Sequence, residues 1–211
     1  MRSTVTAGRI VSGLLAVVAL TWSRPADAQS MELALGSSMP HAELSRQSTN
    51  GNQGTLAAAR GSKGTVVAFW SNECPWVSKS QDRFLALAKE YAGRGIGFVL
   101  VNSNDPVAFP KESLAGSKAY AQASGISLPY LMDTDGQLAR AFGAARTPHV
   151  YVFDADGTLA YVGAIDDSPG DPNNAQVHYL RDALNSISNG TDVAVPRTKA
   201  FGCTIKAPGG R

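Results

Sequence analysis

An apolar run, a cysteine and a proline follow one another in the segment Thr65-Val66-Val67-Ala68-Phe69-Trp70-Ser71-Asn72-Glu73-Cys74-Pro75. The run at residues 65–70 is continuous and partly β-branched, which is typical of a strand buried on both faces of a sheet. Pro75 favours the first turn of a helix, because the N–H that proline lacks would have no partner there. We therefore expect Cys74 at a helix N-terminus, where free backbone N–H groups and the helix dipole stabilise a thiolate.

The residues after Pro75 predict an amphipathic helix followed by a second strand. Apolar side chains recur at i, i+3, i+4 and i+7, and Gly93 ends the pattern; they are Phe84, Leu87, Ala88 and Tyr91. Residues 96–102 form another apolar run, which indicates a second buried strand. A strand, a helix and a strand in this order make a βαβ unit, the element from which parallel sheets are built.

The pattern changes in the second half of the chain. Helices are predicted over residues 112–123 and 137–142, with a short strand at 129–132 between them. Residues 150–153 and 158–162 are apolar runs joined by a turn that ends in Asp-Gly, which predicts a β-hairpin. The fold class is therefore α/β, with a mixed central sheet that has a βαβ half and an antiparallel hairpin and is flanked by helices.

Less regular segments precede and follow this region. Residues 29–64, rich in Ser, Gly, Asn and Gln, predict an extended N-terminal lead-in, and residues 65–190 form the predicted domain. Its last helix should carry a stripe of Val177, Leu180, Leu184 and Ile187 and stop at Asn189-Gly190. Residues 191–211 contain prolines and a Gly-Gly pair, so they predict a C-terminal loop, which carries Cys203.

The first 28 residues have the pattern of a secretory signal peptide. Arg2 and Arg9 precede a short apolar run at residues 10–20, and Ala26-Asp27-Ala28 predicts cleavage after Ala28. The alternative is a membrane anchor, but a spanning helix needs about 20 apolar residues and this run is shorter. We expect a periplasmic or secreted protein that has no membrane association after cleavage.

Composition and charge exclude several classes of function. The 44% hydrophobic and 17% charged residues are typical of a globular protein. Cleavage would remove three of the 19 basic and one of the 17 acidic residues, which leaves a balanced chain. Such a chain has no electrostatic reason to bind nucleic acid. The three histidines lack metal-ligand spacing with each other or with the two cysteines, so neither a metal nor an organic cofactor is implied.

Three segments resemble one known family. Residues 66–77 resemble the active-site segment of thioredoxin-like proteins, especially the redoxin and alkyl hydroperoxide reductase/thiol-specific antioxidant (peroxiredoxin-like) group. Residues 146–149 resemble that family's Thr-Pro loop, and residues 202–206 resemble the Gly-Cys-x-Ile-Lys element that commonly ends an exported subgroup. The resemblance covers residues 35–206 and implies a thioredoxin-like fold, in which the proline of the Thr-Pro loop is cis and faces the active cysteine.

The resemblance also suggests roles for particular residues. Cys74 would be the nucleophile, and Cys203 would be a candidate resolving thiol because it lies in the Gly-Cys-x-Ile-Lys element. Val77 stands where thioredoxins have their second cysteine, which excludes a local Cys-x-x-Cys pair. The substrate would meet Ser71, Trp76, Arg146, Thr147 and Pro148. Arg146 is assigned only because it lies near Pro148 in the sequence, and the proline that typical peroxiredoxins have before the cysteine is replaced here by Val67.

Two classes of function remain open at this point. In the first, the protein is a thiol-dependent oxidoreductase: Cys74 attacks a peroxide or a protein disulfide, Cys203 resolves the product as a Cys74–Cys203 disulfide, and an external thiol reduces it. Both substrates begin with the same thiolate, so the residues do not separate them. In the second, the protein is a non-catalytic binding or interaction module on the same fold, with Cys74 inert or joined to Cys203 in a permanent structural disulfide.

Overall fold

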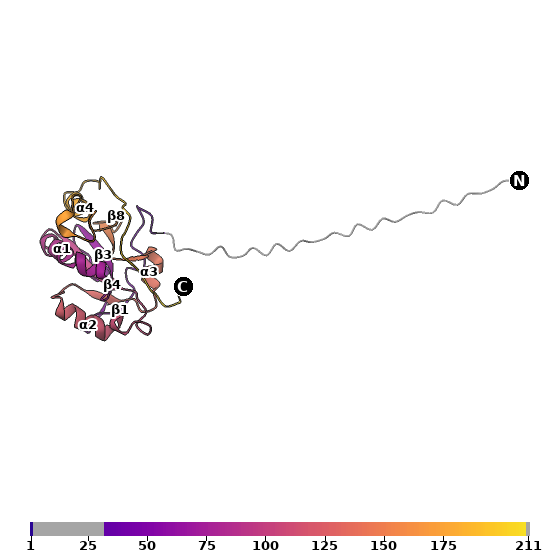
Figure 1. Ribbon diagram of the computed structural model, residues 1–211. Helices are drawn as coiled ribbons and strands as arrows, with labels where there is room; N and C mark the ends of the chain where they lie inside the picture. The colour runs from indigo at the N-terminus through magenta and orange to yellow at the C-terminus, as the bar shows by residue number, and fades with distance from the viewer. Residues whose placement is uncertain (2–31, 210–211) are drawn as a thin grey trace.

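A five-stranded sheet with the order β5-β4-β3-β7-β8 forms the centre of the computed structural model, which describes residue 1 and residues 32–209 (Figure 1). Strands β3, β4 and β5 are parallel, and β7 and β8 are antiparallel to their neighbours. The strands are β3 (Gly64–Trp70), β4 (Ile96–Asn102), β5 (Tyr130–Met132), β7 (His149–Asp154) and β8 (Leu159–Gly163). The predicted mixed sheet, with its parallel half and its hairpin, is confirmed.

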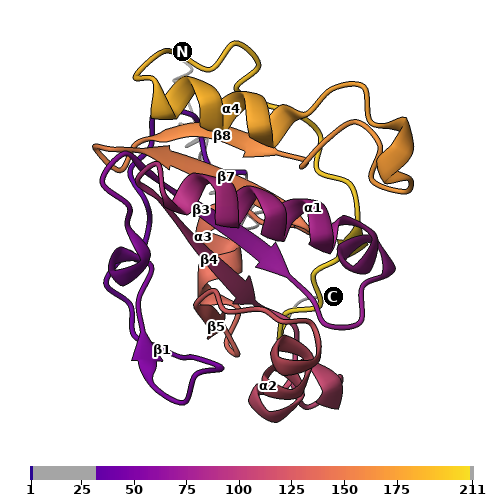
Figure 2. The same cartoon turned by 90° about the vertical axis from the view of Figure 1, so that its left-hand side faces the viewer.

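Helices cover both faces of the sheet, as Figure 2 shows. Helices α1 (Pro75–Ala92) and α4 (Tyr179–Ser188) lie on one face, and α3 (Gln137–Phe142) lies on the other. The side chains of β3 alternate between two hydrophobic clusters: Val66, Ala68 and Trp70 pack with α1 and α4, whereas Val67 and Phe69 pack with α3. This alternation explains why all seven residues of β3 are buried.

Most predicted elements appear with nearly the predicted bounds. The helix predicted over 112–123 begins later: α2 (Leu114–Ala123) is capped by Ser113, whose Oγ accepts from the Gly116 N–H, and the 3₁₀ helix η2 (Pro110–Glu112) precedes it. The last helix also begins later than its apolar stripe predicted. Val177 lies outside α4 and is 39% exposed, because a further 3₁₀ helix, η3 (Pro172–Asn174), and an irregular segment separate the hairpin from α4.

The segment before β3 is more structured than an extended lead-in. It contains a small antiparallel pair, β1 (Arg46–Gln47) and β2 (Gln53–Gly54), followed by the 3₁₀ helix η1 (Ala57–Ala59). Met39 and Leu56 are buried in the same cluster as α3. A few isolated apolar side chains were too sparse to show a period, yet they complete this side of the core.

The C-terminal tail is not entirely a loop, which corrects the prediction for residues 191–211. Strand β9 (Cys203–Thr204) pairs antiparallel with β6 (Arg146–Thr147), the short strand just before β7. Upstream of β9, the Val162 N–H donates to Pro196 and the Thr198 N–H donates to the Val162 carbonyl, at 3.0 Å each. The tail therefore runs along the edge strand β8 and then crosses to the loop that begins β7.

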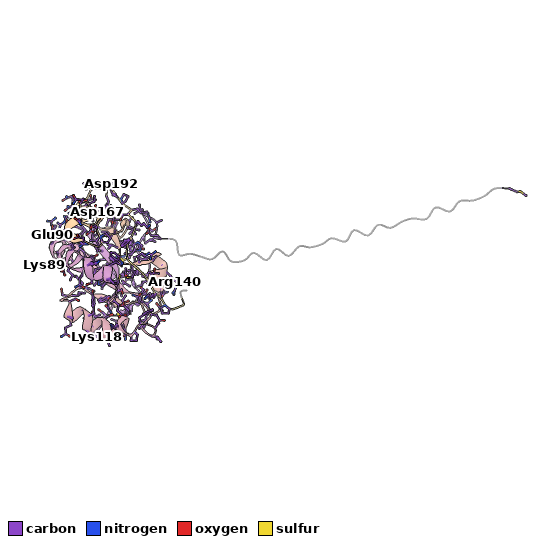
Figure 3. The ribbon with its side chains drawn as sticks, in the orientation of Figure 1. Lys89, Glu90, Lys118, Arg140, Asp167 and Asp192 are labelled. Carbon is purple, nitrogen blue, oxygen red and sulfur yellow. The ribbon has the colours of Figure 1, made fainter. Side chains whose placement is uncertain are left out.

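The predicted signal segment, with its cleavage point after Ala28, lies outside the described residues apart from Met1. Within residues 32–209, no helix combines the length and the apolar character needed to span a bilayer. Side chains of both signs point outward around the molecule, among them Lys89, Glu90, Lys118, Arg140, Asp167 and Asp192, which are labelled in Figure 3.

Candidate active site

Cys74 is the N-cap residue of α1, directly after the loop that leaves β3. Pro75 occupies the first helical position, as predicted, and the sulfur lies at the end of the helix where the first N–H groups are free. The residue is only 3% exposed. Its thiol donates to the carbonyl oxygen of Thr147 at 3.1 Å, so the helix start and the Thr147–Pro148 loop meet at the sulfur.

The Thr147–Pro148 peptide bond is cis, as the family resemblance implied. Thr147 belongs to β6 and Pro148 stands between β6 and β7, so this loop lies beside the end of β3 from which Cys74 emerges. Thr147 is 1% exposed. The structure thus brings the Cys74 thiol to the carbonyl of Thr147, in the loop that also carries Pro148.

Cys203 lies next to the same loop. It is the register partner of Thr147 in the β6–β9 pair, and its side chain is half-buried against the cluster that contains Cys74. Gly202 permits this approach, because its φ is +156° and a Cβ there would stand 2.0 Å from the Thr147 carbonyl oxygen. Both cysteines are free thiols in this structure. The two cysteines are 129 positions apart in the sequence, and the pairing of β9 with β6 brings the tail cysteine to this loop.

The pKa values of the two thiols are shifted in opposite directions. Burial raises the pKa of Cys74, but hydrogen bonding from the Cys203 thiol and from the backbone of Val77 outweighs burial, so the pKa of Cys74 is lowered. Burial and the neighbouring Cys74 raise the pKa of Cys203 to about 11. The thiolate is the reactive form of cysteine, and this pKa difference favours ionisation of Cys74 over ionisation of Cys203.

A small cavity of about 60 Å³ opens beside the two sulfurs. By this measure one water molecule needs about 10 to 15 Å³, so the cavity has room for a few water-sized groups. Cys74 and Cys203 line it together with polar and charged side chains and one ring: Ser71, Glu73, Asn104, Phe109, Glu112, Thr204 and Lys206.

Glu112 lies buried beneath the loop that leads to Cys74, and sequence reasoning did not single it out. Its carboxylate accepts from the Ser71 hydroxyl at 2.5 Å, from the backbone N–H of Asn72 at 2.9 Å and from that of Glu73 at 3.2 Å. Asn102 at the end of β4 adds a fourth donor at 2.7 Å. Hydrogen bonds to a buried carboxylate are strong, so Glu112 fixes the three residues before the cysteine.

The signal for Glu112 in the sequence is weak, since a single glutamate before a helix normally indicates only a solvated turn. Asn102-Ser103-Asn104 at the end of β4 would have been the better clue. Strands β3 and β4 are parallel neighbours, so the residues that follow each of them lie at the same edge of the sheet. Polar residues at the end of β4 therefore lie near the loop that leads from β3 to Cys74.

The other predicted site residues are placed differently. Ser71 lines the cavity, but its hydroxyl hydrogen is directed to Glu112. Trp76 is partly buried beside Cys74 and packs edge-on against Phe201 of the tail, with ring centroids 4.6 Å apart. Arg146 donates to the Thr204 hydroxyl at 2.8 Å and lines a separate, wider pocket with Arg197, so it is not brought to the sulfur cavity.

A mixed sheet, a cysteine at the first turn after a central strand and a cis-proline opposite it define a thioredoxin-like protein. More particularly, the chain belongs to the redoxin family, which its residues 34–178 match. Among curated relatives it is similar to the thiol-disulfide oxidoreductase ResA of Bacillus subtilis (strain 168), with 25% identity over 127 residues. That match covers 60% of this chain and 65% of the relative, so about a third of ResA has no counterpart in it.

Solved structures extend the similarity over most of the chain. A hypothetical protein from Sinorhizobium meliloti 1021 is 36% identical, with a TM-score of 0.78, and the match covers 85% of this chain and 97% of that one. An uncharacterised conserved protein from Geobacillus kaustophilus is 32% identical, with a TM-score of 0.77 and coverage of 84% and 94%. The peroxidoxin BcpB of Mycobacterium tuberculosis, at 17% identity and a TM-score of 0.56 over 75% of this chain and 98% of its own, shares the fold.

Proposed function

We propose that this redoxin is an exported thiol-dependent oxidoreductase in which Cys74 is the nucleophile and Cys203 the resolving thiol. The observation that carries the proposal is the pairing of Cys203 with Thr147, whose carbonyl accepts from Cys74. One loop thereby holds both sulfurs. The opposite pKa shifts of the two thiols support these roles, because the thiol with the lowered pKa ionises more readily.

The first step is an attack by the Cys74 thiolate on a substrate bond. With a hydroperoxide, the sulfur takes one oxygen, the O–O bond breaks, and the leaving alkoxide or hydroxide gains a proton. With a disulfide, the sulfur forms a mixed disulfide and one substrate thiolate leaves. In either case Cys74 is oxidised and the substrate is reduced.

In the second step the two cysteines form a disulfide. Cys203, as its thiolate, attacks the Cys74 sulfur; an S–S bond forms, and hydroxide or the second substrate thiolate leaves. An external dithiol must then reduce the Cys74–Cys203 disulfide. Val77 makes a local partner for Cys74 impossible, which is why the tail has to supply it.

The family supports thiol chemistry without separating the two substrates. ResA is named a thiol-disulfide oxidoreductase. Thiol–disulfide exchange and peroxide reduction both begin with an attack by a cysteine thiolate. We transfer only this shared first step to the present chain. We also propose that residues 1–28 direct export and that the protein works in the periplasm or outside the cell, where a disulfide can persist between reduction events.

Rapid mixing of the reduced protein with hydrogen peroxide, and separately with an unfolded protein that contains a disulfide, tests the proposal. We expect the wild type to lose two hydrogens, C203S to stop at a sulfenic acid or a mixed disulfide, and C74S to do neither. If C74S and wild type behave alike with both oxidants, Cys74 is not the nucleophile. Comparing the two rate constants of the wild type then identifies the preferred substrate.

A further inference from the structure

We propose that Lys206 is a positioning residue for the resolving step: its ammonium group stabilises the Cys203 thiolate while that sulfur attacks Cys74. The inference rests on the proposed function and adds a residue to it. Lys206 lies three residues after Cys203, beyond the end of β9, and lines the same cavity as the two sulfurs. It is also the last residue of the Gly-Cys-x-Ile-Lys element at residues 202–206.

The backbone of Lys206 is anchored on the loop that follows β4. Its N–H donates to the Asn104 side-chain oxygen at 3.0 Å, and its carbonyl accepts from the Asp105 N–H at 2.8 Å. Asn104 is itself buried and held by Asn102. These contacts fix the tail on the far side of Cys203 from Gly202, so that Cys203 is held from both directions.

The Lys206 side chain is also directed. Its Nζ lies 4.2 Å from the centroid of the Phe109 ring, a cation–π contact that favours one placement of a long and otherwise free side chain. Phe109 lines the cavity too. Lys206 is exposed, and the aromatic face of Phe109 favours a placement of its ammonium group beside the cavity.

The other charges at the cavity are already engaged. The Glu73 carboxylate pairs with Lys111 at 3.1 Å, and Glu112 accepts the donors of the cysteine loop. Among the described residues that line the cavity, Lys206 is the one cation. The carboxylates of Glu73 and Glu112 would oppose a negative charge on Cys203, so an ammonium group at the same cavity favours ionisation of the resolving thiol.

The acidity of Cys203 agrees with this geometry. Burial raises its pKa, the Cys74 thiol raises it further, and the Lys206 charge lowers it. In the resolving step the Cys203 thiol gives its proton to solvent and the thiolate attacks the Cys74 sulfur. The S–S bond forms as the S–O bond of a sulfenic acid breaks, and hydroxide leaves and becomes water. Lys206 keeps its proton throughout and forms no bond.

The test compares K206M, which removes the charge, with K206R, which keeps it. K199M is the matched control, since Lys199 is an exposed lysine of the same tail that lines a different pocket. Rapid quench and intact mass follow two rates after peroxide addition: formation of the Cys74 sulfenic acid and its closure to the disulfide. A separate alkylation series against pH measures the pKa of Cys203 in the reduced protein.

We expect K206M to slow closure at pH 7 by about threefold to tenfold, the size expected of one charge near a partly solvated group. Sulfenic acid formation should stay unchanged, the pKa of Cys203 should rise, and K206R should restore both. High salt should shrink the difference, because it screens an exposed charge. Closure at the wild-type rate with an unchanged Cys203 pKa, or equal slowing in K199M, would overturn the proposal.

A failure of the Lys206 proposal can be told apart from a failure of the proposed function. If Cys74 does not react with either oxidant, the oxidoreductase fails as a whole. The alkylation series still decides whether Lys206 acts on Cys203, since it needs no substrate.

Discussion

Thr147 and Cys203 are register partners in the antiparallel pair between β6 and β9. Because the Thr147 carbonyl also accepts from the Cys74 thiol, a two-residue ladder fixes the position of the tail thiol relative to the nucleophile. The resolving cysteine is thus placed by tertiary pairing, and not by its spacing from Cys74 in the sequence. Substitutions in the tail should therefore affect the second step of the reaction more than the first.

Gly202→Ala tests this pairing. The new Cβ would stand 2.0 Å from the Thr147 carbonyl oxygen and 2.6 Å from its carbon, so the tail must move away. We expect disulfide closure to slow on the order of a hundredfold, because displacements of about 1 Å have such effects on positioned groups. Oxidation of Cys74 should continue. Rapid-quench mass spectrometry measures both rates.

Gly209→Ala is the matched control. Gly209 also has a positive φ, +72°, but a Cβ there meets no atom within 4 Å. An alanine there also meets a positive φ, but without the contact to Thr147. Equal slowing of closure in both variants would show that strain in the tail, and not its approach to Thr147, controls the rate.

Glu112→Gln should loosen the loop before Cys74. The Glu112 carboxylate now accepts hydrogen bonds from the Ser71 hydroxyl and from two backbone N–H groups. A glutamine would turn its NH₂ group, which is itself a donor, toward at least one of these donors. We expect the free energy of unfolding to fall by about 2 to 4 kcal/mol. Urea titration measures it, with the exposed Glu43→Gln as control. Faster hydrogen exchange at Asn72 and Glu73 should accompany the loss, and unchanged exchange there would contradict the assignment.

Trp76→Ala should separate large from small substrates. The ring lies beside Cys74 and packs against the half-exposed Phe201, so it offers an apolar surface to a protein substrate. We expect the rate with a protein disulfide to fall about tenfold or more, as for a buried interface tryptophan. Hydrogen peroxide should react within about twofold of the wild-type rate. Val107→Ala, an exposed apolar control at 87% exposure, should change neither rate.

His149 should make stability depend on pH. Burial lowers its pKa from 6.5 to about 4, and the nearby Glu32 is itself paired with Arg197. Between pH 6.5 and 4 the unfolded chain binds a proton that the folded chain does not, so the free energy of unfolding falls as the pH falls. The histidine contributes up to about 3 kcal/mol of this fall. Chemical denaturation across this range should show a shallower dependence in His149→Asn.

The central sheet could be predicted from the sequence because its strands are long apolar runs. The runs at 66–70 and 98–101 are continuously apolar, as expected for strands that are buried on both faces. Helix α3 at 137–142 was also found with its observed bounds, between Gly136 and Gly143, which both have positive φ. Local pattern and tertiary structure agree at these places.

The parts that escaped prediction depend on partners distant in sequence. Strand β9 has two residues and no period, and it exists because β6 offers it an edge. The acceptor role of Glu112 arises from donors at Ser71 to Glu73, about 40 residues earlier in the chain. The meeting of Cys74 and Cys203 belongs to the same class: the residues suggested it through a family resemblance, and no spacing rule could have done so.

The most direct test of the account is to treat the reduced protein with one equivalent of hydrogen peroxide and to map its peptides without reduction. The account predicts a mass loss of two hydrogens and a single peptide pair linking Cys74 to Cys203, which dithiothreitol reverses. A Cys74 that remains an unmodified thiol, or that accumulates as sulfinic acid while Cys203 stays free, would contradict it.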